Sequence, residues 1–355
     1  MALPAAFQRL AILDEAWRIS CPGRRLEAVR QTAPRLKDAI VASGKPAYVR
    51  TCDTATAAYP TRFALQSACL LPLPFVMFRN RLQVVRWQAG GRLRTLLVNP
   101  TDADRSRRAP FFAKQISFAG ERLATRVFSQ KHAEILTSLT ALGIRPEEVD
   151  YLTFDHLHVQ DLRRLLGEWF PNAVLLAQRE ELAIFERLHP MQHAWFIPDA
   201  LDGIDPKRCL ALDGDYLIGP GVALVRTPGH TAGNHTIVLH TDGGVWTISE
   251  NGLCVDNYAP EASDIPGLRR FARFYEVEVI LNANTREQSL DQYTSMILEK
   301  MLADPSHSRP EFGQHFSSSE MIRHPLAPGL APTLQHGGIS HGNGLEDVSR
   351  AAAAT

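Results

Sequence analysis

Two histidines one residue apart, His156 and His158, follow a short apolar run in the segment TFDHLHVQD. A third, His230, stands in TPGHTAGN, which also follows an apolar run. Neutral imidazole is the commonest metal ligand, and three imidazoles with an open position form a catalytic zinc site. The alternative for each segment is a polar loop after a strand. The residue types therefore indicate a metal centre if the fold brings the three rings together.

Four apolar, strand-like runs must position these side chains. The runs YLTF and ALVR lead to the histidine segments, and the runs VWTI and VEVIL lead to Glu250 and to the asparagines of NANT. Short apolar runs bounded by turn signals are typical of buried strands. We expect the ends of these strands to converge at one edge of two packed sheets, in a single cleft.

Hairpins and helices alternate along the rest of the chain. Runs around turn residues predict hairpins over 81–99, 215–230 and 235–249, and VEVILNAN predicts a further strand. The clearest helix is predicted over 129–144, with Ser129 as its N-cap and Gly143 at its end. This mixture predicts an α+β fold of two sheets with helices outside, and not a doubly wound parallel sheet.

Changes in composition divide the chain into three parts. Residues 1–61 are expected to form a helical N-terminal extension, and residues 62–304 contain the strands and the histidine segments. Residues 305–355 are rich in Pro, Gly, Ser and His and lack periodicity, so we expect an irregular tail.

Composition also narrows the classes of partner. Lys and Arg together number 38, the same as Asp and Glu, so no overall field would attract nucleic acid or an anionic membrane. The 16-residue stretch FALQSACLLPLPFVMF is too short, and too interrupted by proline, to cross a bilayer. The five cysteines are odd in number and widely spaced, which favours reduced core thiols. We expect a cytoplasmic protein with a small-molecule partner, no nucleic acid and no membrane.

The two histidine segments, in this order, resemble the metal motifs of the metallo-β-lactamase superfamily. Those motifs are H-x-H-x-D-H and, further along, a His within T-P-G-H-T; here they are matched by HLHVQD and TPGHTAGNH. The resemblance covers most of residues 62–300. It implies an αββα sandwich of two mixed β-sheets, with metal at one edge. It also implies that His156, His158 and His230 are the ligands of the first metal position.

The positions of the second metal depart from the motif. Gln160 and Asp161 stand where the superfamily has Asp and His, and Glu250 stands at the bridging Asp. The last His is replaced by Asn284, with Asn282 as the other candidate. The resemblance therefore implies one divalent metal per chain, most plausibly zinc. Iron or manganese is the alternative, because carboxylates suit harder ions. A second metal held by Asp161 and Glu250 is the less favoured arrangement.

The acidic and amide residues around this centre receive expected roles. Glu250 is a fourth ligand or a general base, and Asp161 is the alternative for either role. Asp155 orients a histidine or is an ordinary loop acid. Gln160 and Asn284 are expected beside the metal centre, supporting its ligands or touching substrate.

The leading function is metal-dependent hydrolysis of a small ester, lactone or thioester by a metal-activated water. The approach segment LGIRPEEVDYLTFDHLH resembles the lactonase and glyoxalase-II-like branches of the superfamily. A mononuclear iron oxygenase of the persulfide dioxygenase type is the first alternative. A non-catalytic member that binds a ligand in the old cleft is the second. Because members are often dimers, the resemblance also implies a homodimer.

Overall fold

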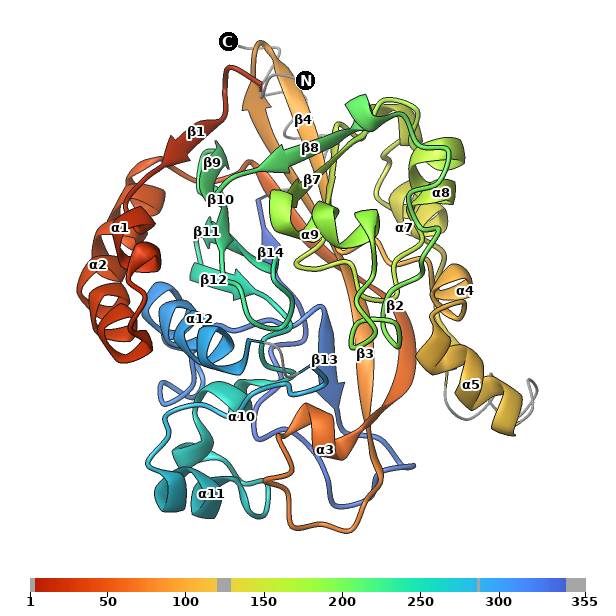
Figure 1. The fold of residues 1–355 in the computed structure, drawn as a ribbon. Coiled ribbons are helices and arrows are strands. Elements are labelled where there is room, and N and C mark those ends of the chain that lie inside the picture. Colours follow the sequence, from red (N-terminus) through yellow and green to blue (C-terminus); the bar gives the residue numbers. More distant parts are fainter. Residues whose placement is uncertain (1–3, 120–128, 286–287, 343–355) are drawn as a thin grey trace.

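The computed structural model describes residues 4–119, 129–285 and 288–342 and is an αββα sandwich (Figure 1). One sheet has five strands in the order β1-β9-β10-β11-β12. The other has nine, in the order β14-β2-β3-β4-β6-β7-β8, with β13 on β3 and β5 on β2. All pairings are antiparallel except those of β4, β6, β7 and β8, which are parallel to their neighbours in that run. The expected α+β class and its two sheets with outer helices are confirmed, but only the larger sheet is mixed, because every pairing in the smaller one is antiparallel.

The elements have the following bounds. The five-stranded sheet contains β1 (Gln8–Leu10), β9 (Asp215–Gly219), β10 (Val222–Arg226), β11 (His235–Thr241) and β12 (Gly244–Ile248). The nine-stranded sheet contains β2 (Tyr48–Pro60), β3 (Phe75–Ala89), β4 (Arg92–Val98), β5 (Ser129–Lys131), β6 (Tyr151–Thr153), β7 (Val174–Gln178), β8 (Cys209–Leu212), β13 (Ser319–Ile322) and β14 (Ser340–His341). The helices are α1 (Asp14–Arg18), α2 (Pro22–Ala42), α3 (Thr61–Ala64), α4 (Ala103–Ser106), α5 (Pro110–Ala119), α7 (Ile135–Ala141), α8 (Leu162–Arg164), α9 (Arg179–Ala183), α10 (Val255–Tyr258), α11 (Leu268–Tyr275) and α12 (Ser289–Leu302).

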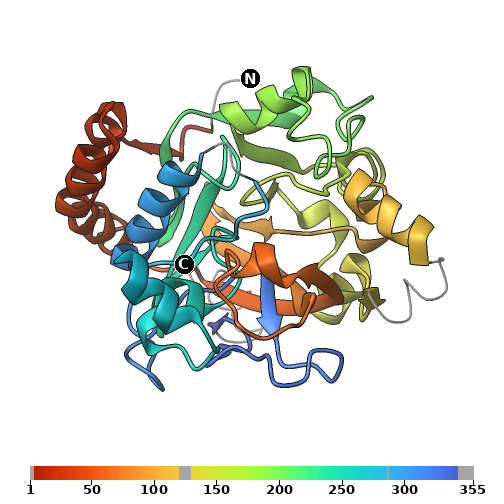
Figure 2. The same cartoon turned by 60° about the horizontal axis from the view of Figure 1, so that its bottom comes forward.

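Apolar side chains hold the layers together. Between the sheets, Val85 and Leu96 of the larger sheet belong to one buried cluster with Leu224 and Ile237 of the smaller sheet. On the outer face of the smaller sheet, α2 and α12 lie side by side and cover β10 and β11 (Figure 2). Because these two strands are covered on both faces, their sequences VALV and IVL are apolar at successive positions instead of alternating.

The three predicted hairpins are confirmed. β3 and β4 pair around Gly90 and Gly91, whose φ angles are +60° and +73°. Two successive residues with positive φ form the tight turn that matches the twist of paired strands, and glycine adopts this conformation without strain. β9 pairs with β10, and β11 with β12.

Two predicted elements differ from the structure. The helix expected over 129–144 begins only at Ile135, so Ser129 is not its N-cap; residues 129–131 instead form β5 along β2. Gly143 does close the helix region, with φ +68°. The strand expected in VEVIL is absent from the described residues: the amide of Ile280 donates to the carbonyl of Asn257 at 2.8 Å, in the segment after β12, and to no strand.

The expected N-terminal extension and the expected tail each contribute strands to the larger sheet. Residues 48–60, expected within a helical extension, form β2, because YVRTCDTATAA is rich in residues that favour strands. The expectation of an irregular tail is wrong for 319–322 and 340–341, which pair with β3 and β2. Residues 343–355 of that expected tail lie outside the described residues.

Two further expectations concern the state of the cysteines and the possibility of a membrane span. All five cysteines are free. Cys254 is buried in the core and Cys52, Cys69 and Cys209 pack against it half-buried, so the expected core position is wrong only for the exposed Cys21. Over the ranges that the structure describes, no helix has the length and apolar character needed to cross a membrane.

A buried ion pair attaches β13 to β3. The Arg81 side chain is 3% exposed and that of Glu320 is 1% exposed, and their charged groups are hydrogen-bonded. Arg81 also pairs with the half-buried Asp53 at 3.1 Å. A buried charge that loses its partner is strongly destabilising, whereas an apolar pair of similar volume is often tolerated.

We predict that Glu320→Gln lowers the free energy of unfolding by about 3 kcal/mol, because Arg81 keeps its charge and loses its buried partner. The double variant Arg81→Met/Glu320→Leu should lose clearly less, since no charge remains buried. Urea unfolding followed by circular dichroism measures both. Equal stability of wild type and Glu320→Gln would contradict the prediction.

Candidate metal centre

The structure brings the three predicted histidines together. His156 and His158 lie in the loop between β6 and α8, and His230 lies in the loop between β10 and β11. One ring nitrogen from each lies within 4.8 Å of the other two, and all three side chains are buried. Across the described ranges, no other group of three or more His, Cys, Asp or Glu side chains has this geometry.

The ring nitrogens of these histidines suit a metal ion. Both ring nitrogens of His158 are buried without a hydrogen-bond partner, a costly state for a polar group. Burial, with smaller contributions from neighbouring histidines, lowers the pKa of His158 and of His230 well below the ordinary value, so both rings are neutral. Neutral imidazole is the form that binds a divalent metal. This donor set therefore fits the ion that the resemblance implies.

Hydrogen bonds turn the other two rings toward the cluster. Nδ1 of His156 lies 3.2 Å from Oδ1 of Asp155, and Nδ1 of His230 lies 3.4 Å from the carbonyl oxygen of Asn282. In each ring Nε2 is then left for the centre, an arrangement that usually accompanies histidine ligands. Asp155 thus occupies the position expected of an orienting residue, and its own amide donates to Oδ1 of Asn99 at 3.1 Å.

The carboxylates of Asp155 and Glu250 lie near His156 and stabilise a positive charge on its ring. Burial alone would lower the pKa of His156, but the carboxylates of Asp155 and Glu250 outweigh it and raise this pKa to about 9. Oε2 of Glu250 lies 3.9 Å from Nε2 of His156, and its Oε1 accepts from the hydroxyl of Ser318 at 2.8 Å. Burial, and then the charge of Asp155, raise the pKa of Glu250. Glu250 therefore lies where a fourth ligand or a general base is expected.

Asp161 lies elsewhere, which corrects the expectation that it is a ligand or a base. Its Oδ2 accepts from Arg108 at 2.6 Å and from Arg163 at 2.7 Å, and its Oδ1 accepts from Nε of Arg163 at 2.9 Å. The physical reason is local: Asp161 is the N-cap of α8 and accepts from the amide of Arg163, which turns the carboxylate away from the histidines.

The amide residues of the altered second position line the pocket beside the histidines. Nε2 of Gln160 donates to Thr101 at 3.1 Å. Oδ1 of Asn284 is buried without a partner among the described residues. Asn282, the other candidate, accepts from the hydroxyl of Tyr59 at 2.8 Å and donates to the Glu250 carbonyl at 3.0 Å. Neither amide replaces the missing carboxylate or imidazole of a second metal site.

Glu181, at the start of α9, is a supporting residue that the sequence patterns did not reveal. Its side chain is fully enclosed, and Oε1 accepts from the amide of Leu157 at 2.7 Å while Oε2 accepts from the hydroxyl of Thr231 at 2.6 Å. Leu157 separates His156 from His158, and Thr231 follows His230. One carboxylate therefore joins the two loops that carry the histidines.

Close backbone packing fixes the same loops. A Cβ on Gly233 would lie 2.1 Å from the amide nitrogen of Glu181, and a Cβ on Gly229 would lie 2.2 Å from the backbone of Gln292 in α12. Gln292 also donates to the Asn282 carbonyl at 2.8 Å, the group that holds His230. The two glycines of TPGHTAGN are thus needed for close approach as well as for turning the chain.

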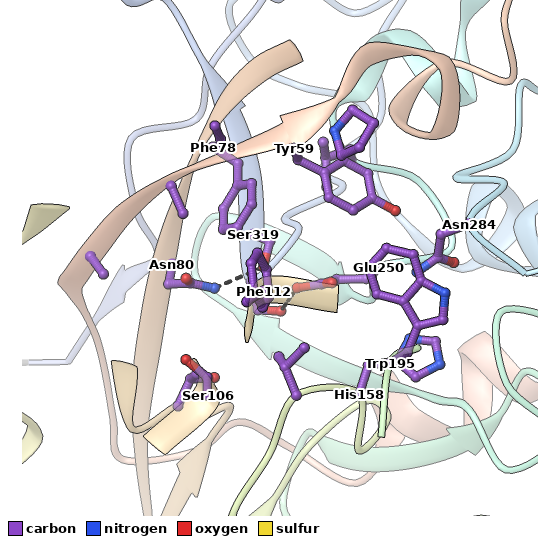
Figure 3. Close-up of a pocket in the computed structure, with 18 of the residues that line it drawn as sticks. Tyr59, Phe78, Asn80, Ser106, Phe112, His158, Trp195, Glu250, Asn284 and Ser319 are labelled. Atoms are coloured by element: carbon purple, nitrogen blue, oxygen red, sulfur yellow. Dashed lines mark hydrogen bonds between the residues drawn. The ribbon is translucent and has the colours of Figure 1, made fainter. Parts of the chain in front are cut away.

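The histidines form part of the wall of a pocket of about 500 Å³ (Figure 3). A volume of this size is typical of small-molecule sites. The large apolar and aromatic side chains of its wall are Tyr59, Phe75, Phe78, Phe112, Ile116, Trp195 and Leu253.

Sequence comparison finds lactonases. No family model matches the chain. Over 108 residues it is 28% identical to an N-acyl homoserine lactonase of Bacillus cereus, which covers 30% of this chain and 40% of the relative. Over 136 residues it is 25% identical to the N-acyl homoserine lactonase of Bacillus thuringiensis subsp. kurstaki, covering 36% and 48%. The chain thus spans less than half the length of each of these relatives.

Structural comparison supports the fold. A probable metal-dependent hydrolase from Staphylococcus aureus superposes with a TM-score of 0.50 at 12% identity, over 71% of this chain and 84% of that one. The αββα sandwich with a histidine cluster at the ends of its strands is the metallo-β-lactamase fold. The resemblance seen in the sequence is therefore confirmed at the level of fold, and the altered second position makes the chain a divergent example.

We predict that Glu181→Gln weakens metal binding about 10- to 100-fold, the usual range for residues that support a ligand without touching the metal. Glutamine keeps the shape but cannot accept at both positions with the strength of a carboxylate. Competition with a chelator measures the affinity. Glu180→Gln, which changes the neighbouring residue, is the control and should bind metal as wild type does. Unchanged metal affinity in a folded Glu181→Gln protein would refute the idea that Glu181 supports the metal ligands by joining their two loops.

Proposed function

We propose that the protein is a metal-dependent hydrolase of a small acyl compound, with one divalent ion held by His156, His158 and His230. One observation carries the proposal: His158 is buried with both ring nitrogens unpartnered, facing two further rings whose Nδ1 atoms are already engaged. A metal ion is the partner that suits such nitrogens, because three neutral imidazoles around one ion, with a fourth position left for water, are the ligand set of a catalytic zinc site.

The residues around the centre have separate roles in the proposed hydrolysis. A divalent metal at such a site lowers the pKa of water and polarises a carbonyl oxygen. Glu250 lies beside His156 and accepts the proton of the attacking water, while Ser318 holds the carboxylate at 2.8 Å. Asp155 keeps His156 in the orientation that presents Nε2. The aromatic wall around Trp195 excludes bulk water from the acyl group.

A lactone is our first choice among ester, lactone and thioester substrates. The two Bacillus relatives are named as lactonases, although less than half of each is matched. The apolar pocket fits the acyl part of such a compound, and the balanced net charge gives no attraction for nucleic acid.

Zinc is the proposed metal, because imidazoles suit it and three histidines are the ligand set of a catalytic zinc site. A mononuclear iron oxygenase would need a carboxylate ligand; Asp161 is engaged by two arginines, so Glu250 would have to serve. We also propose a cytoplasmic homodimer, which light scattering of the purified protein tests.

We predict about one zinc per chain in protein purified without a histidine tag, and its loss in His156→Ala/His158→Ala, because two of three ligands are removed. Elemental analysis measures this. His189→Ala, which removes an exposed imidazole, is the control and should retain the metal. Iron in place of zinc would favour the oxygenase. No metal in wild type, even after incubation with each ion, would leave a non-catalytic binding protein.

We predict that Glu250→Gln lowers kcat for a lactone by about 10²- to 10⁴-fold, the usual contribution of a general base, while zinc is retained. Asp161→Asn should keep kcat within a few-fold of wild type and lose stability instead, because it is an ion-pair residue. A pH-indicator assay measures the rates. The reverse ranking of the two variants would restore Asp161 as the base.

A further inference from the structure

Charge is distributed unevenly along the pocket. Among the described residues that line it, the acids are Asp155 and Glu250, and both stand at the histidine cluster. The cations of the lining, Arg107 and Lys114, come from the segment that contains α4 and α5. Figure 3 shows Ser106, the neighbour of Arg107 in the chain, on the opposite side of the view from Asn284. The acids of the lining thus belong to the histidine cluster and the cations to the α4–α5 segment, which are different parts of the wall.

Arg107 is a partly buried cation without a counter-ion in the described chain. Its Nε is buried with no hydrogen-bond partner, and its guanidinium makes no ion pair with a described residue. Asp104, an acid whose pKa Arg107 helps to lower after the larger effect of Lys131, already accepts from Lys131 at 2.8 Å. A guanidinium stays charged and has donors for a carboxylate, so this residue is left able to bind one.

The next residue, Arg108, differs from Arg107 because it has acidic partners within the protein. It donates to Asp161 at 2.6 Å and to Asp199 at 2.7 Å. A few residues later, the ring of Phe111 stacks on Trp195 with centroids 4.3 Å apart, and its amide donates to the Ala194 carbonyl at 2.8 Å. These contacts fix the segment against the stretch around Trp195, whose carbonyl in turn accepts from the amide of Val159 in the histidine loop at 2.8 Å. The position of Arg107 at the pocket therefore does not depend on a bond of its own.

We propose that Arg107 binds a carboxylate at the far end of the substrate, so that the preferred substrates are acyl compounds whose chain ends in a carboxylate. The proposal rests on the proposed function for the acyl end. Between the two ends, Phe78, Phe112 and Trp195 provide an apolar passage for methylene groups (Figure 3). An uncharged chain would leave the partly buried guanidinium without a partner, which disfavours it.

Ligand binding tests the subsite without relying on catalysis. The probes are hexanedioate, octanedioate and decanedioate, each compared with the monocarboxylate of equal length, and quenching of tryptophan fluorescence reports binding because Trp195 lines the pocket. Wild type should bind at least one dicarboxylate about tenfold more tightly than its monocarboxylate, as expected for one charge-assisted bidentate contact. Arg107→Gln should abolish this difference and Arg107→Lys should restore part of it.

Arg105→Gln is the matched control, because it removes a neighbouring arginine that does not line the pocket; it should keep the preference for dicarboxylates. Equal binding of both acids by wild type, no binding of either, or a preference that survives in folded Arg107→Gln would overturn the proposal. Binding is measured with and without zinc and does not depend on catalysis. The test of the Arg107 subsite is therefore conclusive even if the protein hydrolyses no ester.

Rates of ester hydrolysis then test the carboxylate subsite separately from the proposed hydrolase activity. The nitrophenyl monoester of octanedioic acid should have a kcat/KM about tenfold higher than that of nitrophenyl octanoate, and Arg107→Gln should remove the advantage through KM. Hydrolysis of both esters at equal kcat/KM would sink the carboxylate subsite and leave the hydrolase standing. Hydrolysis of neither ester, together with selective binding of dicarboxylates, would contradict the proposed hydrolase and leave the carboxylate subsite standing.

Discussion

The buried carboxylate of Glu181 is the constraint on which the centre depends. The histidines come from both sheets: His156 and His158 follow a strand of the larger sheet, and His230 follows a strand of the smaller one. Packing of apolar faces fixes the distance between sheets but not the angle of a loop. Glu181 fixes that angle by accepting from both loops, and its own burial is tolerated because its oxygens are bonded.

Asp161 has a structural contact in place of the ligand role that its position in the motif suggests. Where the superfamily motif has a histidine, Asp161 binds Arg108 and Arg163 and so ties α8 to the segment between α4 and α5. Arg108 is the neighbour of Arg107 in the chain, so the ion pair with Asp161 helps to hold the segment that carries the proposed carboxylate subsite.

Local patterns explain what could be predicted from the sequence. The hairpins follow from apolar runs around glycines that accept positive φ, and the approach of His156, His158 and His230 follows from their places after strands. Glu181 could not be found in this way, because an acid in the first turn of a helix is ordinary and its partners are 24 and 50 residues away. β13 was missed for the same reason, since its partner strand lies far back in the chain.

The place of β13 has a consequence for how the protein is made. Residues 319–322 pair with Met77–Asn80 of β3, so the ribosome delivers the partner of that edge long after the edge itself. Until then the edge is a template for wrong pairing, and Glu250 has no Ser318 to hold it. Long-range pairing of this kind folds slowly and exposes the nascent chain to aggregation. A chain synthesised only as far as residue 317 therefore already has its three histidines, while the side of the pocket that Ser318 and Ser319 line is still missing.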